Sequence, residues 1–317
     1  MSASFVTEPI EFGDPSSDDF CVEYPNGLID LSRSIHLEEL VKPDIDTIEE
    51  YIPRMDSTIT LPKLRHGQID IPVTGEKTIR VNTDRTALVI VDMQNFFLHP
   101  DIREHPTGLA CVAPLMKAVK FFREKNVKII WLICSNWGFS EDDLATIPPS
   151  LARGFNANHG SRGFGCKLAG DMGRILMIGE KNTELYGPLQ GLYEDGRDKG
   201  SDFWINKIRM SGLWNQTPLE AFLQKNGIKT LLFAGVNVDD VKPVPHSNYS
   251  IPTLIISQCV LGTIIDANHK GYDCILIEDT TATTSPDVTY QAALYNAGNT
   301  YGFVTCTDKV FNSDNSV

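Results

Sequence analysis

The chain has 317 residues, of which 42% are hydrophobic, 22% charged and 9% aromatic. This composition is typical of a soluble globular protein and excludes disordered, collagen-like and disulfide-rich chains. The net charge of −13 disfavours phosphate backbones and anionic lipid, so we expect neither nucleic acid nor a membrane as a partner and favour a small molecule. No apolar segment approaches the ~18 residues that span a bilayer, and the first residues lack the features of a signal peptide. We therefore expect a cytosolic protein.

The seven cysteines are odd in number, lie far apart and never form a CxxC pair. They predict no disulfide framework, and most are expected to be small buried hydrophobic residues. Cys259 is treated separately, because it stands at the start of a predicted helix.

Residues 1–80 are rich in Asp, Glu, Pro and Ser, and their short apolar segments lack sustained periodicity. We expect an irregular N-terminal extension over these residues. A single folded domain is predicted over residues 81–317.

The pattern changes at Thr86, where TALVIVDMQ predicts a strand buried on both faces of a parallel sheet. A helix over 109–125 and a strand over 127–133 complete a βαβ unit. Residues 138–200 predict long loops with short helices, and such loops often line a site. Strands then follow at 201–206, 229–236, 273–278 and near Phe303, and helices at 216–226, 260–270 and 286–299. This alternation predicts an α/β fold with one doubly wound, mostly parallel sheet of about six strands flanked by helices.

A doubly wound sheet binds ligands beyond the carboxyl ends of its strands. Three residues of the sequence are predicted to lie at this edge of the sheet. Asp92 ends the first strand, Lys207 follows the strand over 201–206, and Cys259 precedes a helix. Each also has a purely structural explanation. Asp92 suits a helix cap or a turn, Lys207 a solvated surface position, and Cys259 a buried filler.

Together the three residue types are suited to acyl transfer at a C–N bond. The positive end of a helix and a nearby ammonium both favour a thiolate, which is the nucleophilic form of cysteine. A carboxylate within reach can take the thiol proton and deliver it to a leaving nitrogen. Backbone N–H groups at the start of the same helix can bind an oxyanion.

The motifs that carry these residues resemble those of the isochorismatase-like cysteine hydrolases. They are DMQNFF at 92–97, INK ending at Lys207, GVNVD at 235–239 and the segment that begins with CVLGT at Cys259, and the resemblance spans about 86–305. The resemblance implies a Rossmann-type three-layer fold and a triad of Cys259 as nucleophile, Asp92 as general base and acid, and Lys207 as supporting cation. It also implies an oxyanion hole from the backbone N–H groups of Cys259 and Asn237, a cis peptide before Asn237, and a homo-oligomer.

The chain departs from the metal-binding members of that superfamily. Those members carry an aspartate and histidines in a DxH-type pattern after the second strand, whereas LICSNWGFSEDDL at that place contains no histidine. We therefore expect no metal ion and no cofactor. The histidines His99, His105, His159, His246 and His269 are interpreted as loop or surface residues.

A second departure is an insertion before Cys259. In relatives the residue that matches Asn237 stands four positions before the cysteine, whereas here 22 positions separate them, so about 18 residues are extra at 241–258. The insertion has three explanations: a lid or loop, an extra strand formed by IPTLIIS, or a retained intron. We favour the intron, because the segment opens with Val (a GT codon), closes with Gln (which can be CAG), and its removal gives GVNVDDCVLGT with the family spacing. If the protein contains the insertion, we expect weakened activity. A single tight turn then no longer positions both the Cys259 nucleophile and the oxyanion donor on Asn237.

The sequence therefore predicts a metal-independent amidohydrolase that cleaves an amide or ureido bond of a small molecule through a cysteine thioester. We expect Asn95, Phe96, Trp137 and Trp214 to contact the substrate, although each also suits a core or surface position. The alternative is a catalytically impaired protein that acts as a binding or oligomeric scaffold, because the insertion interrupts the turn that carries the nucleophile.

Overall fold

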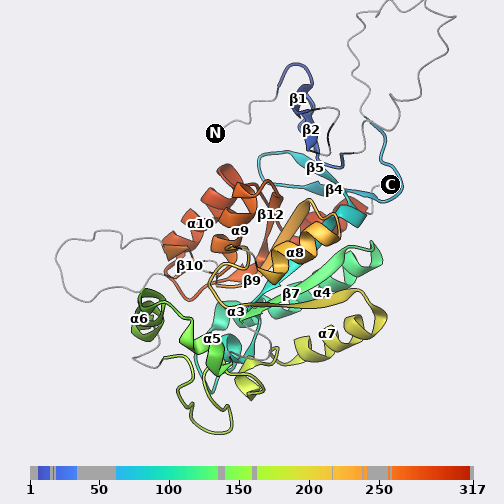
Figure 1. The fold of residues 1–317 in the computed structure, drawn as a ribbon. Helices are drawn as coiled ribbons and strands as arrows, with labels where there is room; N and C mark the ends of the chain where they lie inside the picture. The colour runs from blue at the N-terminus through green and yellow to red at the C-terminus, as the bar shows by residue number, and fades with distance from the viewer. Residues whose placement is uncertain are drawn as a thin grey trace, which may run out of the picture.

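The structure is a computed structural model that describes residues 6–14, 17, 19–33, 62–134, 140–158, 163–215, 217–237, 239–240, 256–257 and 259–314 (Figure 1). Its strands are β1 (Ile10–Gly13), β2 (Phe20–Glu23), β3 (Leu28–Asp30), β4 (Gln68–Pro72), β5 (Thr78–Asn82), β6 (Thr86–Val91), β7 (Lys128–Cys134), β8 (Asp202–Lys207), β9 (Thr230–Val236), β10 (Asp239–Asp240), β11 (Ile256–Ser257), β12 (Asp273–Ala282) and β13 (Phe303–Thr305). Its α-helices are α2 (Asn95–Leu98), α3 (Pro106–Ala110), α4 (Val112–Glu124), α5 (Glu141–Ala145), α6 (Pro149–Asn158), α7 (Pro188–Lys199), α8 (Pro218–Lys225), α9 (Cys259–His269), α10 (Asp287–Asn299) and α11 (Thr307–Asp314).

Six of the strands form one parallel sheet in the order β13-β12-β9-β6-β7-β8. Counted in chain order from β6, this is the order 6-5-4-1-2-3 of a doubly wound sheet. The predicted α/β fold with one mostly parallel sheet of about six strands is therefore confirmed. The direction of winding changes between the central neighbours β6 and β9, and in such sheets this is the place where ligands bind.

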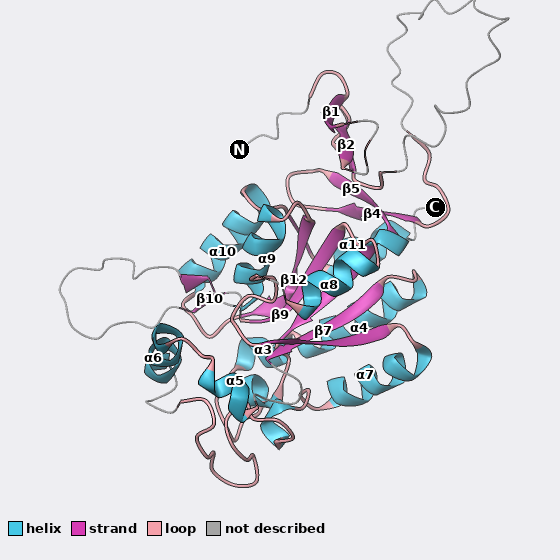
Figure 2. Ribbon diagram, in the orientation of Figure 1, coloured by secondary structure: helices cyan, strands magenta, loops and turns pink. Residues whose placement is uncertain are grey.

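Both faces of this sheet are covered by helices, which is why β6 is buried along its whole length. Successive side chains of a strand point to opposite faces. Leu88 and Ile90 accordingly lie in one core cluster, to which α4, α7 and α11 contribute. Val89 and Val91 lie in the second cluster, which contains side chains of α8, α9 and α10. The result is a three-layer arrangement of helices, sheet and helices (Figure 2).

The described part of residues 1–80 forms a second sheet with the strand order β1-β2-β3-β5-β4. Its neighbouring strands are antiparallel, except for the parallel pair β3 and β5. The expectation of an irregular extension is wrong for these residues, and the predicted boundary at residue 80 falls inside β5. β1, β2, β4 and β5 lie at one end of the molecule (Figure 1).

This second sheet is joined to the main domain through its core. Ile71 and Ile79 share a core cluster with Val310 of α11. Asp70 and Arg80 lie opposite each other in the β4–β5 register and form two hydrogen bonds of 2.7 and 2.8 Å.

The strands of this sheet could not be recognised in the sequence, because strands of three to five residues are too short to show a clear alternation. β3 also pairs with β5, which lies about 50 residues further along the chain. The composition alone therefore indicates a loop.

Two further differences concern helices. The helix predicted over 109–125 is divided into α3 and α4, which meet at Cys111. The region predicted as loops with short helices contains the 12-residue helix α7, which buries Leu189, Leu192 and Tyr193. No helix within the described ranges is long and apolar enough to cross a membrane.

Candidate active site

The carboxyl ends of β6 and β9 meet in register at the centre of the sheet. Asp92 directly follows β6, and Asn237 directly follows β9. Lys207 is the last residue of β8, and Cys259 is the first residue of α9. The fold therefore brings the predicted strand-end residues to the same edge of the sheet.

Asp92 and Lys207 form a buried ion pair. The Lys207 Nζ atom lies 2.8 Å from Asp92 Oδ2, and both side chains are 0% exposed. The Asp92 N–H donates to the backbone oxygen of Leu132 in β7 at 3.0 Å, and the ammonium also donates to the backbone oxygen of Arg209 at 3.3 Å. Removing a single charge from water costs several kcal/mol, so each charge depends on the other. Such a pair can hold a carboxylate in its charged form where water is scarce.

The turn after β9 joins Asn237 to the start of α9. The peptide bond between Val236 and Asn237 is cis, as the resemblance implies. The Val260 N–H donates to the backbone oxygen of Asn237 at 3.2 Å. Cys259 is 7% exposed and belongs to the core cluster of the α9 face. Asn237 and the first turn of α9 are therefore in contact, although the insertion separates them in sequence.

The insertion starts and ends on a short two-stranded ladder. β10 and β11 pair antiparallel, with Asp239 opposite Ser257 and Asp240 opposite Ile256. This pairing and the bond from α9 to Asn237 bring the two ends of the insertion together. Residues 241–255 and 258 lie outside the described residues, so the choice between lid, extra strand and retained intron stays open. The weakened activity expected from the insertion stays a prediction.

Gly235 allows β9 to approach β6 closely beside Asp92. Its φ is +110°, and a Cβ placed on it would lie 2.1 Å from the backbone oxygen of Val91. No larger residue fits without displacing one of the two central strands. Because Asp92 follows Val91 directly, such a displacement would reach the ion pair.

We expect Gly235→Ala to lower the free energy of unfolding by at least about 2 kcal/mol, from its positive φ and the overlap with β6. Turnover should fall as well, because Asp92 moves with the strand end. Urea unfolding and the rate of turnover measure the two effects. Gly191→Ala is the matched control, because Gly191 is exposed in α7 with nothing within 4 Å of its added Cβ. That variant should be unchanged or up to about 1 kcal/mol more stable. Wild-type stability of Gly235→Ala would contradict the prediction.

His105 lies at the same edge, and its interpretation as a loop or surface residue is wrong. Its residue exposure is 1%, its Nδ1 accepts the N–H of Gly108 at 3.0 Å, and its Nε2 lies 2.8 Å from Asn237 Oδ1. Burial lowers the pKa of His105; the hydrogen bond to Asn237 opposes this shift and the charge of Arg103 adds to it. The string HPTG indicates a helix start, but nothing in it reveals a contact with Asn237, 132 positions away.

Of the other four histidines in that interpretation, two belong to the described residues. His99 is partly exposed and accepts the N–H of Asp101 at 3.2 Å, and His269 is exposed at the end of α9. Both fit the predicted loop or surface positions. His159 and His246 lie outside the described residues.

We expect the free energy of unfolding to fall as the pH decreases below the ordinary His pKa of 6.5. The folded state holds the pKa of His105 below that of the unfolded chain, so the unfolded chain binds more protons in this range. The contribution of His105 is complete above pH 6.5 and is lost as the pH falls through the lower pKa of the folded state. Urea unfolding of the wild type and His105→Gln across this range measures the effect. The free energy of unfolding should decline less in His105→Gln than in the wild type, and equal declines would contradict the prediction.

Comparisons with known proteins identify relatives of this chain. Residues 254–309, which include Cys259, match the family model of the isochorismatase domain. The ureidoacrylate amidohydrolase RutB of Methylorubrum extorquens is 24% identical over 250 residues, which cover 77% of this chain and 88% of the relative. RutB of Rhizobium rhizogenes is 23% identical over 256 residues, with coverages of 77% and 88%. Together these matches support the isochorismatase-like hydrolase family for this chain.

Solved structures share the fold of this isochorismatase-like chain. A cysteine hydrolase from Pseudomonas syringae has a TM-score of 0.54 at 20% identity and covers 74% of this chain and 95% of its own. An isochorismatase family protein from Desulfovibrio vulgaris has a TM-score of 0.51 at 16% identity, with coverages of 72% and 97%. The nicotinamidase PncA from Bacillus subtilis has a TM-score of 0.50 at 20% identity, with coverages of 70% and 99%.

Two of the predicted substrate contacts in this isochorismatase-like chain belong to α2. Asn95 is buried, and its Nδ2 donates to the backbone oxygen of Lys181 at 2.9 Å. Phe96 is 1% exposed and packs against the ring of Phe155, with centroids 6.1 Å apart. Both side chains therefore have structural partners, and their contact with a substrate stays a prediction.

The other two predicted contacts are tryptophans. Trp214 lies in the loop after Lys207 and is 42% exposed, and the guanidinium of Arg209 lies 4.9 Å from its ring centroid. Trp137 lies outside the described residues. A substrate contact of either residue stays a prediction.

In the part of the chain that the structure describes, no group of three or more His, Cys, Asp and Glu side chains is arranged to hold a metal ion. The stretch after the second strand, where metal-binding relatives have their ligands, includes residues 135–139, which are not described. The expected independence from metal and cofactor therefore stays a prediction.

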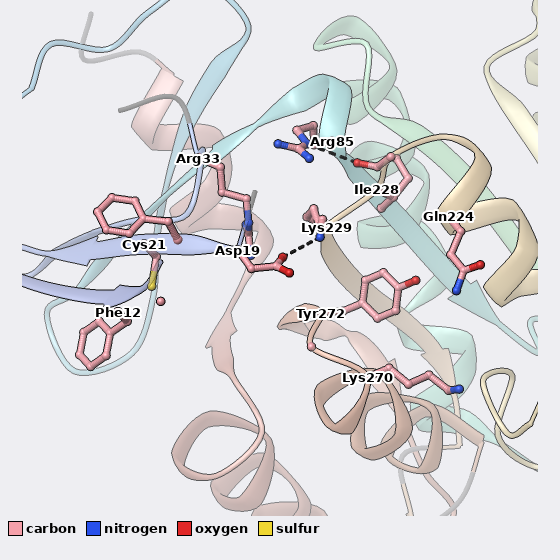
Figure 3. Close-up of a pocket in the computed structure, with 14 residues that line it drawn as sticks. Phe12, Asp19, Cys21, Arg33, Arg85, Gln224, Ile228, Lys229, Lys270 and Tyr272 are labelled. Atoms are coloured by element: carbon pink, nitrogen blue, oxygen red, sulfur yellow. Dashed lines mark hydrogen bonds and ion pairs between the residues drawn. The ribbon is translucent and has the colours of Figure 1, made fainter. Parts of the chain in front are cut away.

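A cavity of about 700 Å³ lies at the opposite edge of the sheet, where β6, β9 and β12 begin (Figure 3). Three of its lining cations have anionic partners: Arg33 lies 2.6 Å from Asp273, Lys229 lies 2.6 Å from Asp19, and Lys270 lies 2.8 Å from Glu220. The fourth, Arg85, donates to the backbone oxygen of Gly227. Figure 3 shows the Lys229–Asp19 pair within the cavity. Because this cavity lies at the far end of the strands from Asp92, we assign it no part in the chemistry.

Proposed function

We propose that this chain is a cysteine-dependent amidohydrolase that cleaves the C–N bond of a small amide or ureide through a thioester on Cys259. The observation that carries the proposal is the buried Asp92–Lys207 ion pair at the strand ends. Thiol-based acyl transfer needs a group that takes and returns a proton, and a shielded carboxylate can serve in this role. The similarity to ureidoacrylate amidohydrolases leads us to propose a ureido compound as the substrate of this chain.

In the first half of the proposed reaction, Asp92 takes the proton of the Cys259 thiol. The thiolate attacks the carbonyl carbon, a C–S bond forms, and the oxygen takes the negative charge. The backbone N–H groups of Cys259 and Asn237 bind this oxyanion. The C–N bond then breaks, and Asp92 gives its proton to the leaving nitrogen, which departs as ammonia or an amine.

In the second half, water attacks the thioester carbon and gives a proton to Asp92. The C–S bond breaks, the acid is released, and the thiolate of Cys259 regains a proton from Asp92. From a ureide the released acid can be a carbamic acid, which breaks down to carbon dioxide and ammonia or an amine. Lys207 is the ion-pair partner of Asp92 and supplies the positive charge that favours the thiolate.

The proposal is tested by ammonia release from a panel of small amides and ureides. We expect the wild type to hydrolyse at least one ureide and Cys259→Ala to hydrolyse none. Mass spectrometry of the acid-quenched reaction should detect the acyl adduct on Cys259. The proposal fails if the wild type hydrolyses no member of the panel, or if Cys259→Ala matches its rate.

The alternative of a catalytically impaired scaffold is motivated by the insertion alone. The β10–β11 pairing and the Val260–Asn237 hydrogen bond keep the ends of the interrupted turn together. Within the described residues we find no contact that favours the scaffold over the enzyme.

Deleting residues 241–258 tests the predicted effect of the insertion. We expect turnover to rise by about tenfold or more, because Asp240 then joins Cys259 and one tight turn sets the nucleophile and Asn237. Steady-state turnover of the full chain and the deletion variant on the same ureide gives the comparison. Equal turnover would contradict the prediction. Sequencing the transcript decides separately whether the 18 codons are a retained intron.

A further inference from the structure

His105 joins distant parts of the chain at the edge of the sheet where the proposed reaction takes place. It precedes α3, and its ring contacts Asn237 at the end of β9. The next residue but one, Thr107, donates its hydroxyl proton to the backbone oxygen of Thr283 after β12, at 2.7 Å. The start of α3 is therefore tied to the ends of two strands.

The contacts of the His105 ring determine which nitrogen carries the proton. The Gly108 N–H donates to Nδ1 at 3.0 Å, and because a backbone amide can only donate, Nδ1 must be an acceptor. The Thr107 hydroxyl also lies 3.2 Å from Nδ1, but its proton is given to Thr283. The neutral ring therefore has its proton on Nε2 and donates it to Asn237 Oδ1 at 2.8 Å.

The surroundings of the ring favour this neutral form. His105 is buried, and burial lowers its pKa against the opposing effect of the hydrogen bond to Asn237. Arg103 is the charged group that acts on the ring, and it lowers the pKa further. The direction of the His105–Asn237 hydrogen bond is thereby fixed at neutral pH.

Asn237 is thus held at two points. Its side chain accepts from His105, and its backbone oxygen accepts the N–H of Val260 in α9. We propose that His105 is a positioning residue that fixes the peptide of Asn237 and so directs its backbone N–H toward the oxyanion. This inference rests on the proposed function, in which that N–H is an oxyanion donor. Because one such donor is worth about 10²- to 10³-fold in rate, a small rotation of this peptide lowers kcat measurably.

Two substitutions separate this role from the capping of α3. Asn is a preferred N-cap residue and can accept the N–H of Gly108, but in His105→Asn the shorter side chain does not reach Asn237. In His105→Gln the longer side chain can donate to Asn237. We expect His105→Asn to lower kcat by about tenfold to a hundredfold with KM changed less than about threefold. His105→Gln should recover kcat to within about fivefold of the wild type.

The matched control is His99→Asn. His99 is partly exposed and bonds to the N–H of Asp101, away from Asn237. This variant should keep the kcat of the wild type. A double variant adds a further check, because His105→Asn should have little additional effect once Asn237→Ala has removed the acceptor.

A second measurement does not depend on turnover. The backbone amide resonance of Asn237 in ¹H–¹⁵N spectra should move in His105→Asn and stay in place in His99→Asn. If the wild type hydrolyses no substrate but this resonance moves, the proposed function fails and the positioning of Asn237 stands. If the wild type is active and His105→Asn keeps its kcat, or if the resonance does not move, the positioning role is overturned and the proposed function stands.

Discussion

Lys207→Met is expected to lower turnover by at least about 10³-fold and the free energy of unfolding by about 3–5 kcal/mol. Methionine fills a similar volume, but it leaves Asp92 as a buried carboxylate without its ammonium partner. The carboxyl group then favours its neutral form, in which it cannot take the proton of the thiol. Urea unfolding and the hydrolysis of the best ureide measure the two losses.

The double variant Asp92→Asn with Lys207→Met separates stability from catalysis. It contains neither charge, so no uncompensated charge remains in the core, and most of the lost stability should return. Turnover should remain at the level of the single variant, because no group is left to move the proton. A single variant that retains a tenth or more of wild-type turnover would contradict the role of the ion pair.

Cys259→Ala is expected to lower turnover by at least about 10⁴-fold, because without the sulfur no thioester can form. Its fold should be preserved, since the substitution removes one atom at the first turn of α9 and fills no new space. The free energy of unfolding should therefore change by less than about 1 kcal/mol. Turnover and urea unfolding of the same preparation measure both quantities.

Thiol labelling distinguishes an assembled site from the scaffold alternative. Burial raises the pKa of Cys111 to about 12 and also raises the pKa of Cys274, so both should react slowly. Cys166 is exposed, which makes Cys166→Ser the suitable background. Near neutral pH, iodoacetamide should then label Cys259 at least about tenfold faster than the remaining thiols. Uniformly slow labelling of all cysteines would favour the scaffold.

The elements that could be read from the sequence are those whose pattern is local and continuous. The apolar run that begins at Thr86 predicted β6, and the polar residue after it, Asp92, lies at the edge of the sheet as expected. The alternation of strands and helices then indicated the doubly wound sheet. A parallel sheet covered on both faces requires long apolar strands, so the pattern is strong where the fold is regular.

The elements that were missed depend on contacts between distant residues. β3 and β5 are short, and each becomes a strand because it pairs with neighbours on both sides: β3 lies between β2 and β5, and β5 lies between β3 and β4. His105 is similar, because the residues around it indicate a helix start, whereas its partner Asn237 is contributed by a different strand. Pattern and propensity describe the neighbours of a residue in the chain, and they contain no information on which remote group it meets.

For this protein, the order of buried strands and helices and the residue types at the strand ends were determined by the sequence itself, because burial and periodicity act over a few consecutive residues. The approach of the Lys207 ammonium to the Asp92 carboxylate, the contact of α9 with Asn237 across the insertion, and the hydrogen bond of His105 to Asn237 were decided only by the tertiary structure. Each of these depends on a distance of about 3 Å between groups that the chain holds far apart until the strands pair.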